Sequence, residues 1–128
     1  MTSILERTRR PDVTFYRDGR IDITAHAAIE LGLKAGDVID IARDGMEYYM
    51  YVSHKAEEVT GRHEAQVYPT SKCKRVCHNF RAHSVRLCRE VLRLNGAKER
   101  ARLITGKAIE TAETGRALPI IIRLKFED

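Results

Sequence analysis

The chain has 128 residues, of which 43% are hydrophobic and 32% charged, with a net charge of +5 and three cysteines. This length suits one compact domain or two small units that pack together. The sequence has no long apolar run, which excludes a membrane span, and an odd number of cysteines argues against a secreted disulfide framework. Residues 1–12 contain arginines but no apolar segment, which indicates a flexible arm rather than a secretory signal. We therefore expect a soluble, cytoplasmic protein.

The net charge hides a strong asymmetry along the chain. Residues 1–71 hold 9 Lys or Arg against 12 Asp or Glu, whereas residues 72–107 hold 11 against 2, a net of +9. Residues 108–128 hold 3 against 4. Clustered basic residues favour a polyanionic partner, because neutralising phosphates releases condensed counterions. The alternative is an ordinary solvated basic face.

The first half, residues 13–53, predicts a β-β-α-β-β order. Alternating apolar residues indicate strands, and two Asp-Gly pairs indicate tight hairpin turns. Thr24 is a suitable N-cap for a short helix, and Gly32 a suitable stop. The expected strands cover residues 13–16, 21–24, 38–42 and 46–52, and the expected helix covers residues 25–31.

The second half, residues 73–128, follows a polar linker at 54–72. Its clearest element is an amphipathic helix from His83 to Asn95, closed by Gly96. Apolar side chains fill one broad half of this helix, and three arginines fill a narrow arc on the opposite side. The expected strands of this half cover residues 65–68 (within the linker), 74–80, 100–104, 108–112 and 118–126.

The two halves share an outline. Segments 24–32 and 81–96 both lead from a strand through Ala-His into an apolar helix that ends at glycine. An internal duplication or the shared outline of any β-α-β unit would explain this pattern. We expect a strand-rich α+β fold, with two β-α-β-β type units in a small barrel-like or pseudo-dimeric arrangement.

Residues 13–52 contain three short motifs, in the order Asp18-Gly19-Arg20-Ile21, Leu31-Gly32-Leu33 and Gly36-Asp37-Val38. With this order and spacing the segment resembles the AbrB/SpoVT-type swapped-hairpin DNA-binding domain. The resemblance implies a module in which two β-β-α-β-β units interleave into one barrel, usually by dimerisation. Arg20 matches the arginine after the family's turn glycine. Thr24 replaces a frequent proline, and the family's basic residues near Ala28 and Ile29 are missing, so we expect the second half to hold the DNA contacts.

The sharpest local feature is the arginine stripe Arg86, Arg89 and Arg93 on the second helix. Spaced over about 10 Å of helix, these side chains can contact successive phosphates, and few acidic residues lie near them in sequence. The structural alternative is the solvent face of an amphipathic helix. The complete set of predicted nucleic-acid contacts is Arg20, Lys72, Lys74, Arg75, Arg81, Arg86, Arg89, Arg93, Arg100 and Arg102.

Tyrosines at positions 16, 48, 49 and 51 suit either base stacking or core packing, and strand alternation favours the core for part of this set. Cys73, Cys77, His78, His83 and Cys88 lack the paired C-x2-C spacing of structural zinc sites, and Cys88 lies in the apolar arc of its helix. We therefore predict no metal and no cofactor. The sequence also contains no nucleotide-binding loop, no nucleophile elbow and no metalloprotease motif, so we expect binding rather than catalysis.

These features together predict a DNA-binding protein that contacts phosphates through its basic second half. A transcriptional regulator and an accessory factor of a mobile element are both consistent with this prediction. Duplex DNA is the favoured partner, and the oligomeric alternatives are a homodimer and a pseudo-dimer within one chain. Two other functions stay open: a single-stranded nucleic-acid binder that uses exposed tyrosines, and a protein-interaction module for an acidic partner.

Overall fold

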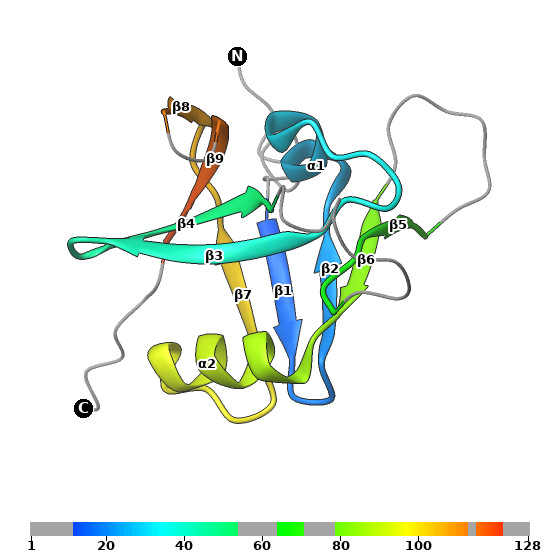
Figure 1. Cartoon of the computed structure of the whole chain (residues 1–128). Coiled ribbons are helices and arrows are strands. Elements are labelled where there is room, and N and C mark those ends of the chain that lie inside the picture. Colours follow the sequence, from blue (N-terminus) through cyan, green and yellow to red (C-terminus); the bar gives the residue numbers. More distant parts are fainter. Residues whose placement is uncertain (1–11, 54–63, 71–78, 113–114, 122–128) are drawn as a thin grey trace, which may run out of the picture.

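The computed structural model describes residues 12–53, 64–70, 79–112 and 115–121, and these residues form nine strands and two helices. The helices are α1 (Ala25–Leu31) and α2 (Val85–Asn95), which lie at opposite ends of the structure (Figure 1). The strands are β1 (Asp12–Tyr16), β2 (Arg20–Ile23), β3 (Ile39–Asp44), β4 (Glu47–Val52), β5 (Tyr68–Pro69), β6 (Phe80–His83), β7 (Arg100–Ile104), β8 (Ile109–Thr111) and β9 (Gly115–Ile120).

The strands form two antiparallel sheets, and each sheet combines strands from both halves of the chain. The five-stranded sheet has the order β5-β6-β2-β1-β7, and the four-stranded sheet has the order β3-β4-β9-β8. Isolated pairings of Val38 with Gln66 and of Thr105 with Ile120 connect the two sheets. The strand-rich α+β fold is therefore confirmed, but within the described ranges the two sheets do not close into a single barrel.

A single apolar core lies between the two sheets. Val13, Phe15 and Ile21 of the five-stranded sheet and Met50 and Leu118 of the four-stranded sheet are fully buried in it. These side chains come from both halves, because β1, β2 and β4 precede residue 54 whereas β9 follows residue 114. The two halves thus bury one shared set of side chains.

Both helices follow a strand directly and have the same type of caps. Thr24 caps α1 by accepting a hydrogen bond from the Ala27 N–H, and Ser84 caps α2 by accepting one from the Leu87 N–H. Gly32 and Gly96 end the two helices in the left-handed conformation. These observations confirm the predicted bounds of the first helix.

The second helix was predicted to begin at His83, and this is wrong because residues Phe80–His83 form β6. Their side chains alternate between buried and exposed, and the strand pairs with β2 over its whole length. The predicted strand 74–80 therefore overlaps β6 only at Phe80, and residues 74–78 lie outside the described ranges.

Other predicted boundaries are also shifted. The expected strand 65–68 is reduced to Tyr68–Pro69, and β9 already begins at Gly115 rather than at residue 118. Asp12, assigned to the N-terminal arm, is the buried first residue of β1. Among the helices that the structure describes, the longer has 11 residues, and neither has the length and apolar character needed to cross a membrane.

The β1–β2 turn generates a stability prediction. Gly19 and Gly45 both have positive φ angles, of 104° and 64°, but a Cβ atom at Gly19 would lie only 2.8 Å from His83 Nε2. A Cβ atom at Gly45 would meet nothing within 4 Å. We expect Gly45→Ala to lower the free energy of unfolding by about 1–2 kcal/mol through backbone strain alone, and Gly19→Ala to lower it further.

Urea unfolding followed by circular dichroism measures both variants on the same scale. An equal decrease in the free energy of unfolding of the two variants would contradict the close packing of the β1–β2 turn against His83.

Candidate nucleic-acid interface

The outer face of the five-stranded sheet collects four of the predicted arginines. Successive side chains in a strand point to opposite faces, so Val13 and Phe15 of β1 enter the core while Thr14 and Tyr16 point outward. The same alternation in β2, β6 and β7 turns Arg20, Arg81, Arg100 and Arg102 outward.

Strand register arranges the outward side chains in two neighbouring rows. The first row crosses all five strands, and direct pairing places its members side by side in the order Tyr68, Arg81, Asp22, Thr14, Arg102. In the second row His83 pairs with Arg20 and Tyr16 pairs with Arg100, while Arg20 lies over the Tyr16 ring. The rows are two residues apart along each strand, or about 7 Å.

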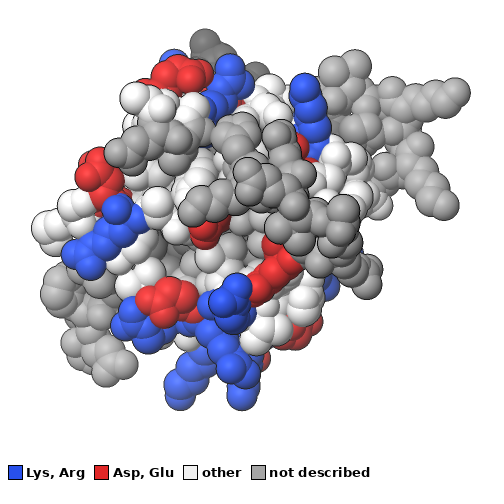
Figure 2. Space-filling model, in the orientation of Figure 1, with Lys and Arg blue, Asp and Glu red and all other residues white. Residues whose placement is uncertain are grey.

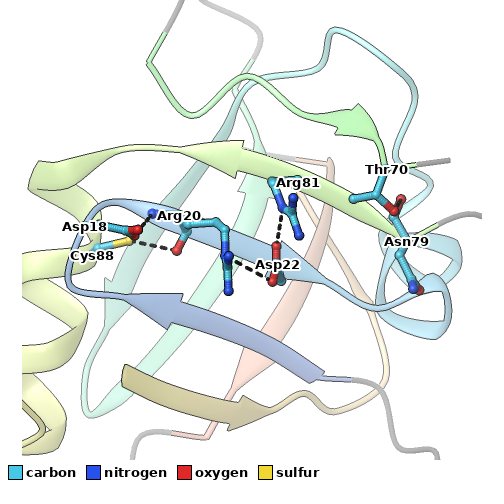
Figure 3. Close-up of polar contacts among 7 residues, drawn as sticks. All are labelled: Asp18, Arg20, Asp22, Thr70, Asn79, Arg81 and Cys88. Carbon is cyan, nitrogen blue, oxygen red and sulfur yellow. Dashed lines mark hydrogen bonds and ion pairs between the residues drawn. The ribbon is translucent and has the colours of Figure 1, made fainter. Parts of the chain in front are cut away.

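Asp22 holds two of these arginines in place. Arg81 donates from Nε to Asp22 Oδ1 at 2.7 Å, and Arg20 Nε lies 3.4 Å from Asp22 Oδ2. The Arg20 guanidinium also lies 4.0 Å from the centre of the Tyr16 ring, a cation–π contact. Figure 3 shows Arg20, Asp22 and Arg81 together over β2 and β6. A single carboxylate thus orients two guanidinium groups and neutralises only one of them.

The other two arginines lie on β7, at the edge of the sheet. Arg102 donates from Nε to Asp12 Oδ2 at 2.7 Å, and the Asp12 side chain is only 5% exposed. Arg100 is exposed and forms no ion pair with any residue that the structure describes. The two rows therefore contain four arginines and the carboxylate of Asp22, with Asp12 beside Arg102 one row further along the strands.

Two shallow grooves follow this face and share Arg81. One has a volume of about 430 Å³ and is lined by residues that include Thr14, Arg81, Arg100 and Arg102. The other, of about 800 Å³, is lined by residues that include Arg20, Tyr68, Arg81 and His83. Carboxylates also line both grooves, those of Asp12 and Asp22 in the first and those of Asp18 and Glu64 in the second. The face is therefore a broad, open surface with arginines and carboxylates side by side rather than an enclosed small-molecule pocket.

The arginine stripe of α2 is exposed as predicted, but the expected shortage of acidic partners is wrong. Arg86 forms a bidentate pair with Glu64, with its closest contact at 2.7 Å, and Arg93 pairs with Glu90. Of the three, only Arg89 has no carboxylate partner within the described part of the chain. Figure 2 accordingly shows basic and acidic side chains intermingled on the face that it views. The carboxylate of Glu90 on α2 and that of Glu64 beside the helix neutralise two of the three arginines.

The remaining predicted contacts and ligands are placed as follows. Lys72, Lys74 and Arg75, together with Cys73, Cys77 and His78, lie outside the described residues. Cys88 is fully buried, and burial raises the pKa of its thiol to about 11, so it packs as a small apolar side chain, as predicted. Within the ranges described, no group of three or more His, Cys, Asp or Glu side chains is arranged to hold a metal ion.

None of the four tyrosines named from the sequence is fully buried, so the core packing expected for part of this set is not observed. Tyr48, Tyr49 and Tyr51 lie half-buried on β4, and the hydroxyls of Tyr49 and Tyr51 donate to Glu47 and Asp40. Tyr16 is the predicted tyrosine that lies on the basic face. Tyr68, which sequence analysis assigned only to a short strand, is 52% exposed on that face beside Arg81. The alternation Gln66-Val67-Tyr68, with Val67 as the core residue, was the signal that could have placed Tyr68 outward.

Comparisons of this chain with family models, curated proteins and solved structures return no match.

Ser84 and Arg86 form a clamp around the Glu64 carboxylate by donating hydrogen bonds to it, and this clamp predicts how Glu64 responds to pH. Hydrogen bonds from Arg86 and then from Ser84 lower the pKa of Glu64 below its ordinary value of 4.5. A lowered pKa in the folded state contributes stability above the ordinary value, and this contribution is lost as the pH falls through the folded pKa. We therefore expect the carboxyl carbon of Glu64 to titrate below pH 4.5 in an NMR titration, and closer to 4.5 in Arg86→Gln. An unchanged Glu64 pKa in this variant would show that the clamp is not formed in solution.

Proposed function

We propose that this protein binds nucleic acid through the outer face of its five-stranded sheet, with DNA as the expected partner. The observation that carries the proposal is the set of four outward arginines in two adjacent rows, in which Arg20 and Arg81 share one carboxylate and Arg100 has no ion pair with a described residue. Guanidinium groups bind phosphate oxygens in a bidentate manner, and clustered cations gain affinity from counterion release. The proposed role is binding and not catalysis.

The other exposed elements suit a polyanion less well. Helix α1 contains no Lys or Arg. The β3–β4 hairpin carries Asp40, Asp44 and Glu47 against Arg43 alone. The α2 stripe retains a single arginine without a carboxylate partner among the described residues. The hairpin therefore repels a phosphate backbone, and the sheet face gathers more arginines in one place than α2 does.

We further propose that the two halves of the chain form a pseudo-dimer of β-α-β-β type units. Three observations support it: β2 and β6 pair with each other, each leads into a capped helix, and each helix ends at a left-handed glycine. In addition, β7, which follows α2, pairs with β1 of the other half. The AbrB-type resemblance implies an interleaving of two units, which in that family usually come from two chains, and these pairings support the proposal that both units lie in this one chain.

Salt-dependent binding of a fluorescent oligonucleotide tests the proposed interface. We expect Arg81→Ala/Arg100→Ala to weaken binding and to lower the slope of log K against log salt by between one and two, since each lost phosphate contact removes about 0.7–0.9. Arg102 is retained in this variant because its removal would leave the buried carboxylate of Asp12 without its partner.

Two control variants keep this test specific. Arg116→Ala removes an exposed arginine from β9 of the other sheet and should leave the slope unchanged. Arg89→Ala/Arg93→Ala removes two arginines from α2 and should have less effect than the sheet variant. A larger effect of the α2 variant would move the interface to the helix. Binding to an acidic protein, with no affinity for DNA at low salt, would replace the proposed function by protein recognition.

A further inference from the structure

We infer that the sheet face binds an unpaired strand, with a base stacked on Tyr68 and the neighbouring phosphates held by Arg81 and Arg20. This inference rests on the proposed function and specifies the form of nucleic acid that the same face takes. It depends on the dimensions of the face, on the exposure of one aromatic ring and on the position of that ring beside the arginines.

The width of the face disfavours its insertion into a groove of duplex DNA. Five strands at about 4.8 Å spacing make a surface about 19 Å wide, whereas the major groove of B-DNA is about 12 Å wide and admits a helix or a two-stranded ribbon. The helix α2 packs against β1, β2 and β7 with its buried side chains in the shared core, so it does not stand on the outer face. A broad sheet surface of this kind can instead hold a strand whose bases are splayed out.

Tyr68 is the aromatic side chain on this face that is most open to a ligand. It lies on the edge strand β5 and is 52% exposed. It is directly opposite Arg81 in the register, and both line the same groove with Arg20 and His83. An exposed aromatic ring with guanidinium groups beside it is the combination that binds single strands without strong sequence preference.

The rings of Tyr16 and Tyr68 differ in how easily a base can stack on them. The Arg20 guanidinium covers the Tyr16 ring at 4.0 Å, so a base can reach that ring only by displacing the cation. The two tyrosines are three strands and one row apart, about 16 Å. The accessible ring is therefore Tyr68, while the Arg20–Tyr16 stack presents a fixed positive charge for the phosphate that follows.

Fluorescence provides a direct test, because the chain contains no tryptophan. Tyr68→Trp places one indole at the stacking position, and we expect a single-stranded 12-mer to quench its emission, with a duplex of the same sequence quenching it far less. In anisotropy titrations we expect Tyr68→Ala to weaken single-strand binding by roughly 5- to 100-fold and to change duplex binding by less than about twofold. Tyr68→Phe retains the ring and should bind like the natural protein.

A matched control and separate outcomes distinguish this inference from the proposed function. Tyr49→Ala removes a half-buried tyrosine from the other sheet and should leave single-strand binding unchanged. Equal binding of duplex and single strand, with no loss in Tyr68→Ala, would overturn the inference while the arginine variants still supported nucleic-acid binding. If neither oligonucleotide bound to the natural protein at low salt, the proposed function itself would fail.

Discussion

The antiparallel pairing of β2 with β6 joins segments that are far apart in the sequence, and most of the structure depends on it. The register from Arg20↔His83 to Ile23↔Phe80 places the N-termini of α1 and α2 at opposite ends of one strand pair. It also turns Ile21 and Ile23 into the core and Asp22 and Arg81 onto the outer face. A shift of this register by one residue would exchange the two faces, so core packing and the position of the arginines are fixed together.

The distribution of charge along the sequence is a poor guide to its distribution on the surface. The basic segment 72–107 carries a net charge of +9, but the fold brings acidic residues from the preceding part of the chain to it. Asp22 and Asp12 bind Arg81 and Arg102 on the sheet, and Glu64 binds Arg86 on α2. These pairs orient the guanidinium groups and place acidic and basic side chains side by side on both surfaces.

Short stretches of sequence predicted the parts of the fold that depend on residues close together in the chain, such as turns and helix caps. The hairpin at Gly19, the first helix with its Thr24 cap, and the strand order of the first half are all visible in short stretches of sequence. The start of α2 was missed because Ala82 and His83 suit a helix as well as a strand, and only pairing with β2 decides between them. The four arginines of the sheet face are among the contacts predicted from the sequence, but the division of the predicted arginines between a sheet face and a helix depends on long-range register. The exposed position of Tyr68 depends on it too.

The claim that the outer sheet face is the nucleic-acid interface can be tested most directly by titrating the ¹⁵N-labelled protein with a short single-stranded oligonucleotide. The account predicts that the largest amide shift changes fall on β1, β2, β5, β6 and β7, with those of Tyr68, Arg81 and Arg100 among them. Changes concentrated on α2 or on the β3–β4 hairpin, with the sheet unaffected, would contradict it.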